Sequence, residues 1–247
     1  MRVTGAYFSP TGGTRRALEA LCALLGEETD LVELTGPQKQ SRQLGREDLL
    51  VLALPVYAGQ IPAVPGLLDG LRGEDTPCVL VAAYGNRHYD DALAQMRRLM
   101  GERGFRCAGA AAVITPHIFA PTLGVGRPDG ADREVLASFA RAVREKLAGA
   151  DWAEAQVPGN PSPAPRAAVP VQKDRDWDIC LGCGFCAQVC PTGAMDRQSL
   201  LWDDEKCISC MSCVARCPVG ALGYNSSALA ARLTEKFSQP RPVETFV

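Results

Sequence analysis

Two short runs of cysteine are the residues best suited to bind metal. Both follow the spacing C-x2-C-x2-C-x3-C-P, and the second run begins 27 residues after the first. This spacing lets one loop present three thiolates to the irons of a cubane, while the fourth cysteine ligates the other cluster. We therefore predict two 4Fe–4S clusters, the first held by Cys180, Cys183, Cys186 and Cys217 (the first set) and the second by Cys207, Cys210, Cys213 and Cys190 (the second set).

Zinc and disulfides are the alternatives for these cysteines. Zinc prefers two well-separated C-x2-C pairs. A disulfide framework would need an oxidising compartment, whereas residues 1–5 run straight into a strand pattern instead of a signal peptide. Over about residues 173–225 the chain resembles bacterial two-cluster ferredoxins, and Pro191, Gly193 and Ala194 recur as Pro218, Gly220 and Ala221.

Length and composition bound the rest of the chain. The 247 residues leave room for one further domain of ordinary size beside the cysteine-rich segment. A formal net charge of −2 does not indicate a nucleic-acid-binding protein. No apolar run reaches the ~18 residues of a membrane span. Eleven cysteines without a secretion signal favour a reducing cytoplasm, and we expect Cys22, Cys78 and Cys107 to be small core residues.

A second candidate binding site follows the first strand pattern, at residues 3–8. A turn rich in Gly, Ser and Thr leads into a helical pattern at 12–25, and a helix N-terminus of this kind attracts anions. The turn lacks the lysine of a P-loop NTPase, so a single phosphate monoester suits it better than a triphosphate. It resembles the phosphate loop of flavodoxins, [ST]-x-T-G-x-T, which implies an FMN phosphate site at Ser9, Thr11, Gly12, Gly13 and Thr14. The alternative is an ordinary capped helix start.

Strand and helix patterns alternate through the first 150 residues. Further strands are predicted at 30–34, 48–54, 77–83 and 107–114, and further helices at 64–71, 90–103 and 131–148, with a short one near 38–44. This alternation predicts a parallel sheet covered on both faces. The fold class is therefore α/β, a flavodoxin-like, doubly wound, five-stranded parallel sheet of order 2-1-3-4-5, with a small α+β two-cluster ferredoxin domain.

Two loops would then flank a flavin ring, because they follow the third and fourth strands. Tyr57 would stack on one ring face and Tyr84 or Tyr89 on the other, while Gly59 and Gly85 would allow close backbone approach. The alternative is that these tyrosines lie at the ends of strands and contact no cofactor. The candidate flavin contacts are Pro55, Val56, Tyr57, Ala58, Gly59, Tyr84, Gly85, Asn86, Arg87 and Tyr89.

Taken together, these motifs resemble the flavodoxin–ferredoxin fusion family over most of the chain. The resemblance rests on residues 8–14, 55–59, 84–87 and 126–128 and on both cysteine runs. It implies one FMN, two 4Fe–4S clusters and redox partner proteins. One departure is that the flavin loops of small electron-carrier flavodoxins are acidic, whereas this chain offers Arg87 and His88, so a very low flavin potential is not expected.

The remaining segments are connections. Residues 115–130 form a longer loop than sheet connections need, in which His117 and Phe119 either line a substrate or docking surface or lie on a plain surface loop. We expect an FMN domain at 1–150, a proline-rich linker at 151–172, the ferredoxin domain at 173–225, and a helix and tail at 226–247. The helix spans Ser226–Phe237, and the tail from Gln239 would lie along the surface or fray.

Three functions fit these features. The favoured one is an intracellular carrier that passes electrons between two 4Fe–4S clusters and FMN and on to partner proteins. The second is an FMN-dependent reductase of a small substrate, fed by its own ferredoxin domain, although no catalytic acid and no Rossmann G-x-G-x-x-G fingerprint is identifiable. The third is a docking scaffold that has lost its flavin. A cavity open over the Tyr57 loop would favour the reductase, and a flavin edge facing the ferredoxin would favour the carrier.

Overall fold

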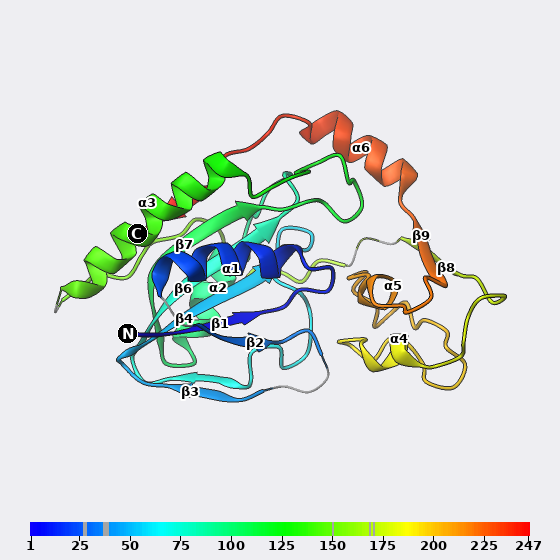
Figure 1. Ribbon diagram of the computed structural model, residues 1–247, viewed down its shortest axis with the longest axis horizontal. Helices are drawn as coiled ribbons and strands as arrows, with labels where there is room; N and C mark the ends of the chain where they lie inside the picture. Colours follow the sequence, from blue (N-terminus) through cyan, green and yellow to red (C-terminus); the bar gives the residue numbers. More distant parts are fainter. Residues whose placement is uncertain (27–28, 37–39, 150, 168, 170) are drawn as a thin grey trace.

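A six-stranded sheet forms the centre of the larger part of the molecule (Figure 1). The computed structural model describes residues 1–26, 29–36, 40–149, 151–167, 169 and 171–247. Five strands of the sheet are parallel: β1 (Arg2–Tyr7), β2 (Thr29–Glu33), β4 (Asp48–Pro55), β6 (Thr76–Tyr84) and β7 (Phe105–Ile114). They lie in the order β2-β1-β4-β6-β7, the 2-1-3-4-5 arrangement of flavodoxin-like sheets.

The sixth strand comes from the far end of the described chain. β10 (Glu244–Phe246) pairs antiparallel with the outer edge of β7, between Ala110 and Ala112. The sheet therefore has one strand more than the five that were expected, and the tail from Gln239 does not fray. Without β10, the outer edge of β7 would leave its backbone hydrogen-bonding groups unpaired. The tail therefore gains hydrogen bonds at this edge, and it also gains apolar burial because the neighbouring Val243 is buried.

Helices cover both faces of this sheet. In Figure 1, α1 (Gly13–Leu25) and α3 (Gly130–Ala148) lie in front, and α2 (Ala92–Gly101) lies behind, against β6 and β7. All nine residues of β6 are buried, as expected of a central parallel strand with helices on both sides. Cys22, Cys78 and Cys107 are buried in this core, which confirms their prediction as core residues.

Two predicted helices are wrong. In place of the helix expected at 64–71, residues 65–70 are turns that lead into β5 (Leu71–Gly73), because Gly66 adopts a positive φ of 63°, which a helix does not allow. Of the helix expected near 38–44, residues 38–39 lie outside the described residues. Arg42–Leu44 form β3, which pairs parallel with β5 in a small separate sheet.

The cysteine-rich segment is built from two equivalent halves. β8 (Gln172–Arg175) pairs antiparallel with β9 (Leu222–Asn225), and one short helix follows each cysteine loop: α4 (Phe185–Gln188) and α5 (Ser212–Ala215). The two helices are offset by 27 residues, the period of the cysteine runs. This small α+β unit lies beyond the carboxyl ends of the parallel strands, on the right of Figure 1.

Two segments connect the units. The linker packs on the larger domain, since the Ala155 amide donates to the Cys107 carbonyl at 2.8 Å and Gly159 lies against the backbone of Asp90 and Asp91. After β9 the chain forms α6 (Ser227–Phe237), which confirms the predicted helix, and Figure 1 shows it crossing back toward α3. The smaller unit is thus attached at both its ends to the larger one.

Candidate cofactor sites

None of the eight cysteines of the two sets forms a disulfide. In the second set, burial raises the pKa of the Cys210 thiol to about 12, and the nearby Cys213, Cys190 and Cys207 thiolates contribute to the rise. Cys190, although it lies in the first run, is thus close to the cysteines of the second. Across the described residues, no three His, Cys, Asp or Glu side chains converge as they would on one metal ion.

The backbone around the two sets repeats closely. The fourth cysteines accept equivalent bonds, from the Ala194 amide to Cys190 Sγ at 3.2 Å and from the Ala221 amide to Cys217 Sγ at 3.3 Å. Within the loops, Gly182 and Gly184 have positive φ, and so do their counterparts Ser209 and Met211. Left-handed residues turn the chain so that amides face the thiols, which is the kind of support that metal ligands need.

A cavity of about 500 Å³ lies where the larger domain meets the cysteine-rich segment. Its walls include all three loops that the sequence places at the carboxyl ends of the strands. The predicted residues that line it are Ser9, Thr11, Gly13, Thr14, Pro55, Val56, Tyr57, Ala58, Gly59, Tyr84, Gly85 and Arg87, together with His117 and Phe119 of the 115–130 loop. Gly12, Asn86 and Tyr89 are not among its lining residues in the described part of the chain.

The phosphate-loop end of the cavity has unused hydrogen-bond donors. The Ser9 hydroxyl accepts the Arg15 amide at 3.0 Å, whereas the amides of Gly13 and Thr14, at the start of α1, have no acceptor among the described residues. A Cβ added to Gly12 would lie 3.3 Å from a guanidinium nitrogen of Arg16, so a cation adjoins the loop. Free amides and a positive charge at a helix N-terminus fit a phosphate.

Tyr57 begins a tight turn that faces the cysteine-rich segment. Its amide and that of Gln60 exchange bonds with each other's carbonyls at 2.8 and 3.0 Å, and Ala58 and Gly59 both have positive φ, as in a type I′ turn. Burial raises the pKa of the Tyr57 phenol well above its usual value, and the Cys210 thiolate adds to the rise. The Tyr57 side chain therefore lies between the cavity and the second set.

The two loop glycines are needed for contacts within the protein. A Cβ on Gly59 would collide with Asp90 Oδ2, and one on Gly85 would collide with the His117 ring. The space above each glycine is therefore filled by a protein side chain, and both glycines also line the cavity, where their close approach to a flavin stays a prediction.

Other predicted residues hold the tail. Asn86 donates to the carbonyls of Phe237 and Gln239 at 2.7 and 2.9 Å and accepts the Arg241 amide at 2.9 Å. The Tyr89 hydroxyl donates to Glu244 of β10 at 2.8 Å. These side chains fix the loop after β6 to the returning chain, outside the cavity lining.

Arg87 lines the cavity but is already paired, since its Nη1 lies 2.5 Å from Asp90 Oδ2. Asp90 also pairs with Arg166 of the linker at 3.3 Å, and Arg166 Nη1 donates to the Ala58 carbonyl at 2.6 Å. The carboxylate shared by the two guanidinium groups offsets part of the positive charge expected near a flavin ring.

Several lining residues were missed by sequence reasoning. They come from segments read as connections or as ligand spacers: Thr115, Arg166, Ala167, Val169, Ile208, Ser209, Leu229 and Leu233. Ile208 and Ser209 lie between two cysteines of the second set, so their place in the cavity wall brings that set next to the strand-end loops. Helical spacing puts Leu229 and Leu233 on one face of α6, and this spacing was the one sequence signal that could have identified any of these lining residues.

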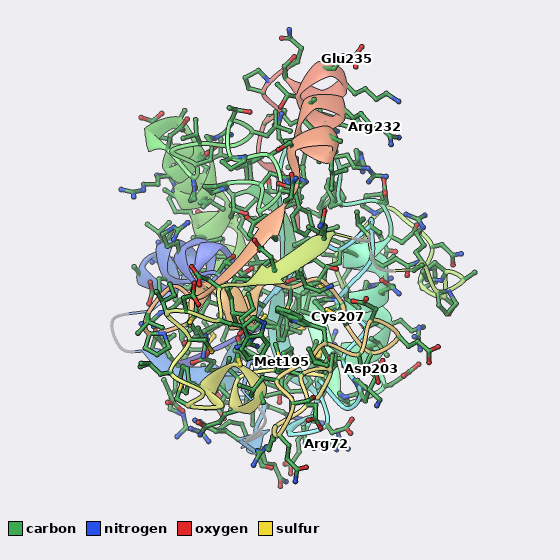
Figure 2. The ribbon with its side chains drawn as sticks, turned by 90° about the vertical axis from the view of Figure 1, so that its right-hand side faces the viewer. Arg72, Met195, Asp203, Cys207, Arg232 and Glu235 are labelled. Carbon is green, nitrogen blue, oxygen red and sulfur yellow. The ribbon has the colours of Figure 1, made fainter. Side chains whose placement is uncertain are left out.

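Figure 2 looks onto the cysteine-rich end of the molecule, where Met195 and Cys207 lie near the centre. Arg232 and Glu235 of α6 project outward at the top, consistent with their exposure and with the opposite α6 face lining the cavity.

Residues 172–218 match the 4Fe-4S dicluster domain family. That family covers both cysteine runs, so the cysteine-rich segment is a ferredoxin-type 4Fe–4S domain. The search of curated proteins found no match to the chain. No helix in the described part of the chain is long and apolar enough to span a bilayer.

The larger domain is similar in backbone to three solved structures. They are a candidate flavoprotein from Bacteroides eggerthii (15% identity, TM-score 0.40), a flavodoxin from Streptococcus pneumoniae TIGR4 (16%, 0.41) and a candidate flavoprotein from Bacteroides uniformis (13%, 0.37). The matches cover 57–59% of this chain and 97–99% of those chains. The flavodoxin-like fold assignment itself rests on the strand order. The chain therefore joins a flavodoxin-like α/β domain to a 4Fe–4S dicluster domain.

Proposed function

We propose that this protein transfers electrons between two 4Fe–4S clusters and one bound FMN, and exchanges them with partner redox proteins. The observation that carries the proposal is the shared cavity. The phosphate-loop residues line one part of it, and Ile208 and Ser209, which separate Cys207 from Cys210, line another. A flavin in that cavity would lie beside the second cluster.

The eight cysteines would hold the clusters in the two sets defined above. FMN would be held by the amides of Gly13 and Thr14, the hydroxyls of Ser9, Thr11 and Thr14, and the nearby Arg16. Tyr57 would contact the ring from the side of the second set. When bound, these groups supply one-electron carriers and a carrier able to store two electrons, which is why they are useful together.

The proposed domain boundaries follow the same division. The FMN domain occupies residues 1–150, the linker 151–172, the dicluster domain 173–225 and the C-terminal helix and tail 226–247. The linker and the tail both pack on the FMN domain, since Arg166 donates a hydrogen bond to the Ala58 carbonyl and β10 pairs with β7.

Anaerobic purification with flavin, iron and sulfide analysis tests the cofactors directly. We expect one FMN and two 4Fe–4S clusters per chain. FMN should bind much more tightly than riboflavin, because riboflavin leaves the amides of Gly13 and Thr14 without an anion. The variant Thr11→Ala/Thr14→Ala should weaken FMN more than riboflavin in fluorescence titrations. Equal affinity for the two flavins would refute the phosphate loop.

A small-substrate reductase is the second candidate function. Its supporting observation is the apolar cover of the cavity by Phe119, Leu229 and Leu233, which would exclude water from a substrate beside the ring. Flavin reoxidation by partner proteins, compared with that by small quinones, nitroaromatics and enones, separates the two roles. Reoxidation that is fast with a small molecule and saturates with its concentration would favour the reductase.

A further inference from the structure

Arg175 and Trp202 occupy equivalent positions in the two halves of the dicluster domain. They are 27 residues apart, the period of the cysteine runs. The strand pairing agrees, because Arg175 pairs with Leu222 in β8 and β9, and Trp202 pairs with Met195 in the corresponding bridge. The two halves thus carry a cation and a neutral indole at the same place in the repeat.

The Arg175 guanidinium lies directly against the first set. Its nitrogens are 3.3 Å from Cys180 Sγ and 3.7 Å from Cys186 Sγ, and it also donates to the Leu200 carbonyl at 2.8 Å. The rings of Trp177 and Trp202 lie 5.0 and 5.4 Å from its central carbon, so apolar surface screens it from water. No carboxylate forms an ion pair with Arg175 among the residues that the structure describes.

Trp202 gives the second set a weaker donor. Trp202, Cys190 and Cys213 all pack against one small hydrophobic cluster of this domain, so the neutral indole lies near the second set. The indole nitrogen is buried and has no hydrogen-bond acceptor at normal distance among the described residues. Cys213 is the counterpart of Cys186, so the same ligand position faces a formal charge in one half and a neutral N–H in the other.

One cation does lie near the second set. The Lys173 ammonium is close to Cys207, but it pairs with Asp204 at 3.0 Å. The paired carboxylate offsets part of its charge, whereas the charge of Arg175 is not offset in this way among the described residues. Reduction adds a negative charge to a cluster, so an uncompensated cation at hydrogen-bond distance from its ligands favours the reduced form.

We propose that Arg175 makes the first cluster easier to reduce than the second. The first electron taken from a one-electron donor then rests on the cluster ligated by Cys180, Cys183, Cys186 and Cys217, and the second electron enters the cluster beside the cavity. This inference rests on the proposed binding of two clusters. Because Arg175 acts on the cluster through its cysteine ligands, it is a positioning and tuning residue.

The test is an EPR-monitored redox titration of the full-length anaerobic protein. Cys190→Ala isolates the signal of the first cluster and Cys217→Ala that of the second. In the Cys190→Ala background, Arg175→Gln should lower the reduced-to-oxidised ratio at fixed potential at least tenfold, a shift of about −59 mV. Arg175→Lys should recover much of this shift, and Arg175→Gln in the Cys217→Ala background should move the second cluster much less.

The reverse variant keeps the proposal testable if Arg175→Gln fails to retain its cluster. Trp202→Arg should raise the reduced-to-oxidised ratio of the second cluster, and Trp202→Phe should leave it nearly unchanged. An unchanged first-cluster potential in Arg175→Gln, or equal shifts in both clusters, would overturn the inference. Iron and sulfide contents below two clusters in the unmodified protein would instead overturn the proposed function.

Discussion

The two halves of the dicluster domain have the same backbone but different surroundings. In the first loop, Leu181 is 68% exposed and Cys183 is exposed, and the left-handed positions are glycines 182 and 184. In the second loop, Met211 is 2% exposed and packs in one hydrophobic cluster with Phe119 and Val171. Among the described residues, the Met211 side chain of the second loop packs against Phe119 of the flavodoxin-like domain, whereas Gly184 at the matching position has no side chain.

This difference separates what the cofactor requires from what the neighbouring domain requires. Ligand spacing and backbone conformation are shared by the halves, as the proposed binding of the same kind of cluster by each cysteine set requires. Ser209 and Met211 adopt left-handed conformations that glycine would adopt with less strain, at a cost of about 1–2 kcal/mol per residue. Burial of Met211 in the interface offsets this strain, whereas a Cβ at Gly184 would meet no atom within 4 Å, so no packing would offset it there.

The largest predicted effect concerns the exchange of ligands between halves. Cys190→Ala should remove the cluster bound mainly by Cys207, Cys210 and Cys213, although Cys190 lies in the first run. The reason is that Cys190 lies near these thiols. Iron analysis and EPR of the reduced variant should show one remaining cluster, and Cys217→Ala should lose the other one. Loss of only the first cluster in Cys190→Ala would contradict the ligand exchange.

Exposure predicts a difference in lability between the clusters. During air oxidation or chelation, the first cluster should be lost several-fold faster than the second, because Cys183 is exposed and Cys210 is buried. EPR samples taken during the reaction, with Cys190→Ala and Cys217→Ala as references for the two signals, would measure both rates. Equal rates would mean that the exposure of the ligands does not control access to the clusters.

A substitution at Met211 in the second loop tests whether backbone strain or side-chain packing has the larger effect on stability. Met211→Gly relieves the left-handed strain but removes a buried side chain, so we expect a net destabilisation of about 1–3 kcal/mol. Gly184→Ala is the matched change in the first loop, where an added Cβ meets no atom within 4 Å, and it should cost about 1 kcal/mol from strain alone. Thermal unfolding under anaerobic conditions would compare them. A stabilised Met211→Gly protein would show that the interface contact is weak.

The smallest predicted effect is a pH dependence near the same interface. Burial lowers the pKa of His117 to about 4, so its neutral form is favoured in the folded state. The unfolded chain binds a proton more readily, and stability is therefore lost as pH falls below about 6.5, by about 1 kcal/mol at pH 5.5. His117→Gln should flatten the dependence of the urea midpoint between pH 7.5 and 5.5. An unchanged slope in His117→Gln would assign the effect to other groups.

The sequence reveals the parts of the site that depend on local spacing. The cysteine runs, the turn from Ser9 to Thr14 and the loops after β4 and β6 each have a pattern set by their own chemistry, and the parallel strands follow from long buried runs such as residues 77–83. The strand order adds the rest, because it brings these loops to one edge of the sheet.

Local sequence patterns did not predict which other segments close the cavity. Arg166 lies in a proline-rich segment, and Ile208 has the appearance of a spacer between ligands, yet both line the cavity. Their positions depend on how two domains pack, and no periodicity of either segment encodes that contact. β10 is similar, since a three-residue strand is defined only by the free edge of β7 that it meets.

The return of the chain to β7 affects how the protein can be made. During synthesis the edge of β7 stays without its antiparallel partner until the entire dicluster segment and α6 have left the ribosome. An unpaired strand edge is a site of aggregation, so the nascent larger domain is exposed to this hazard while the smaller one is still emerging. A protein cut after α3 would retain this open edge permanently, and we expect it to aggregate unless residues 239–247 are supplied as a separate peptide.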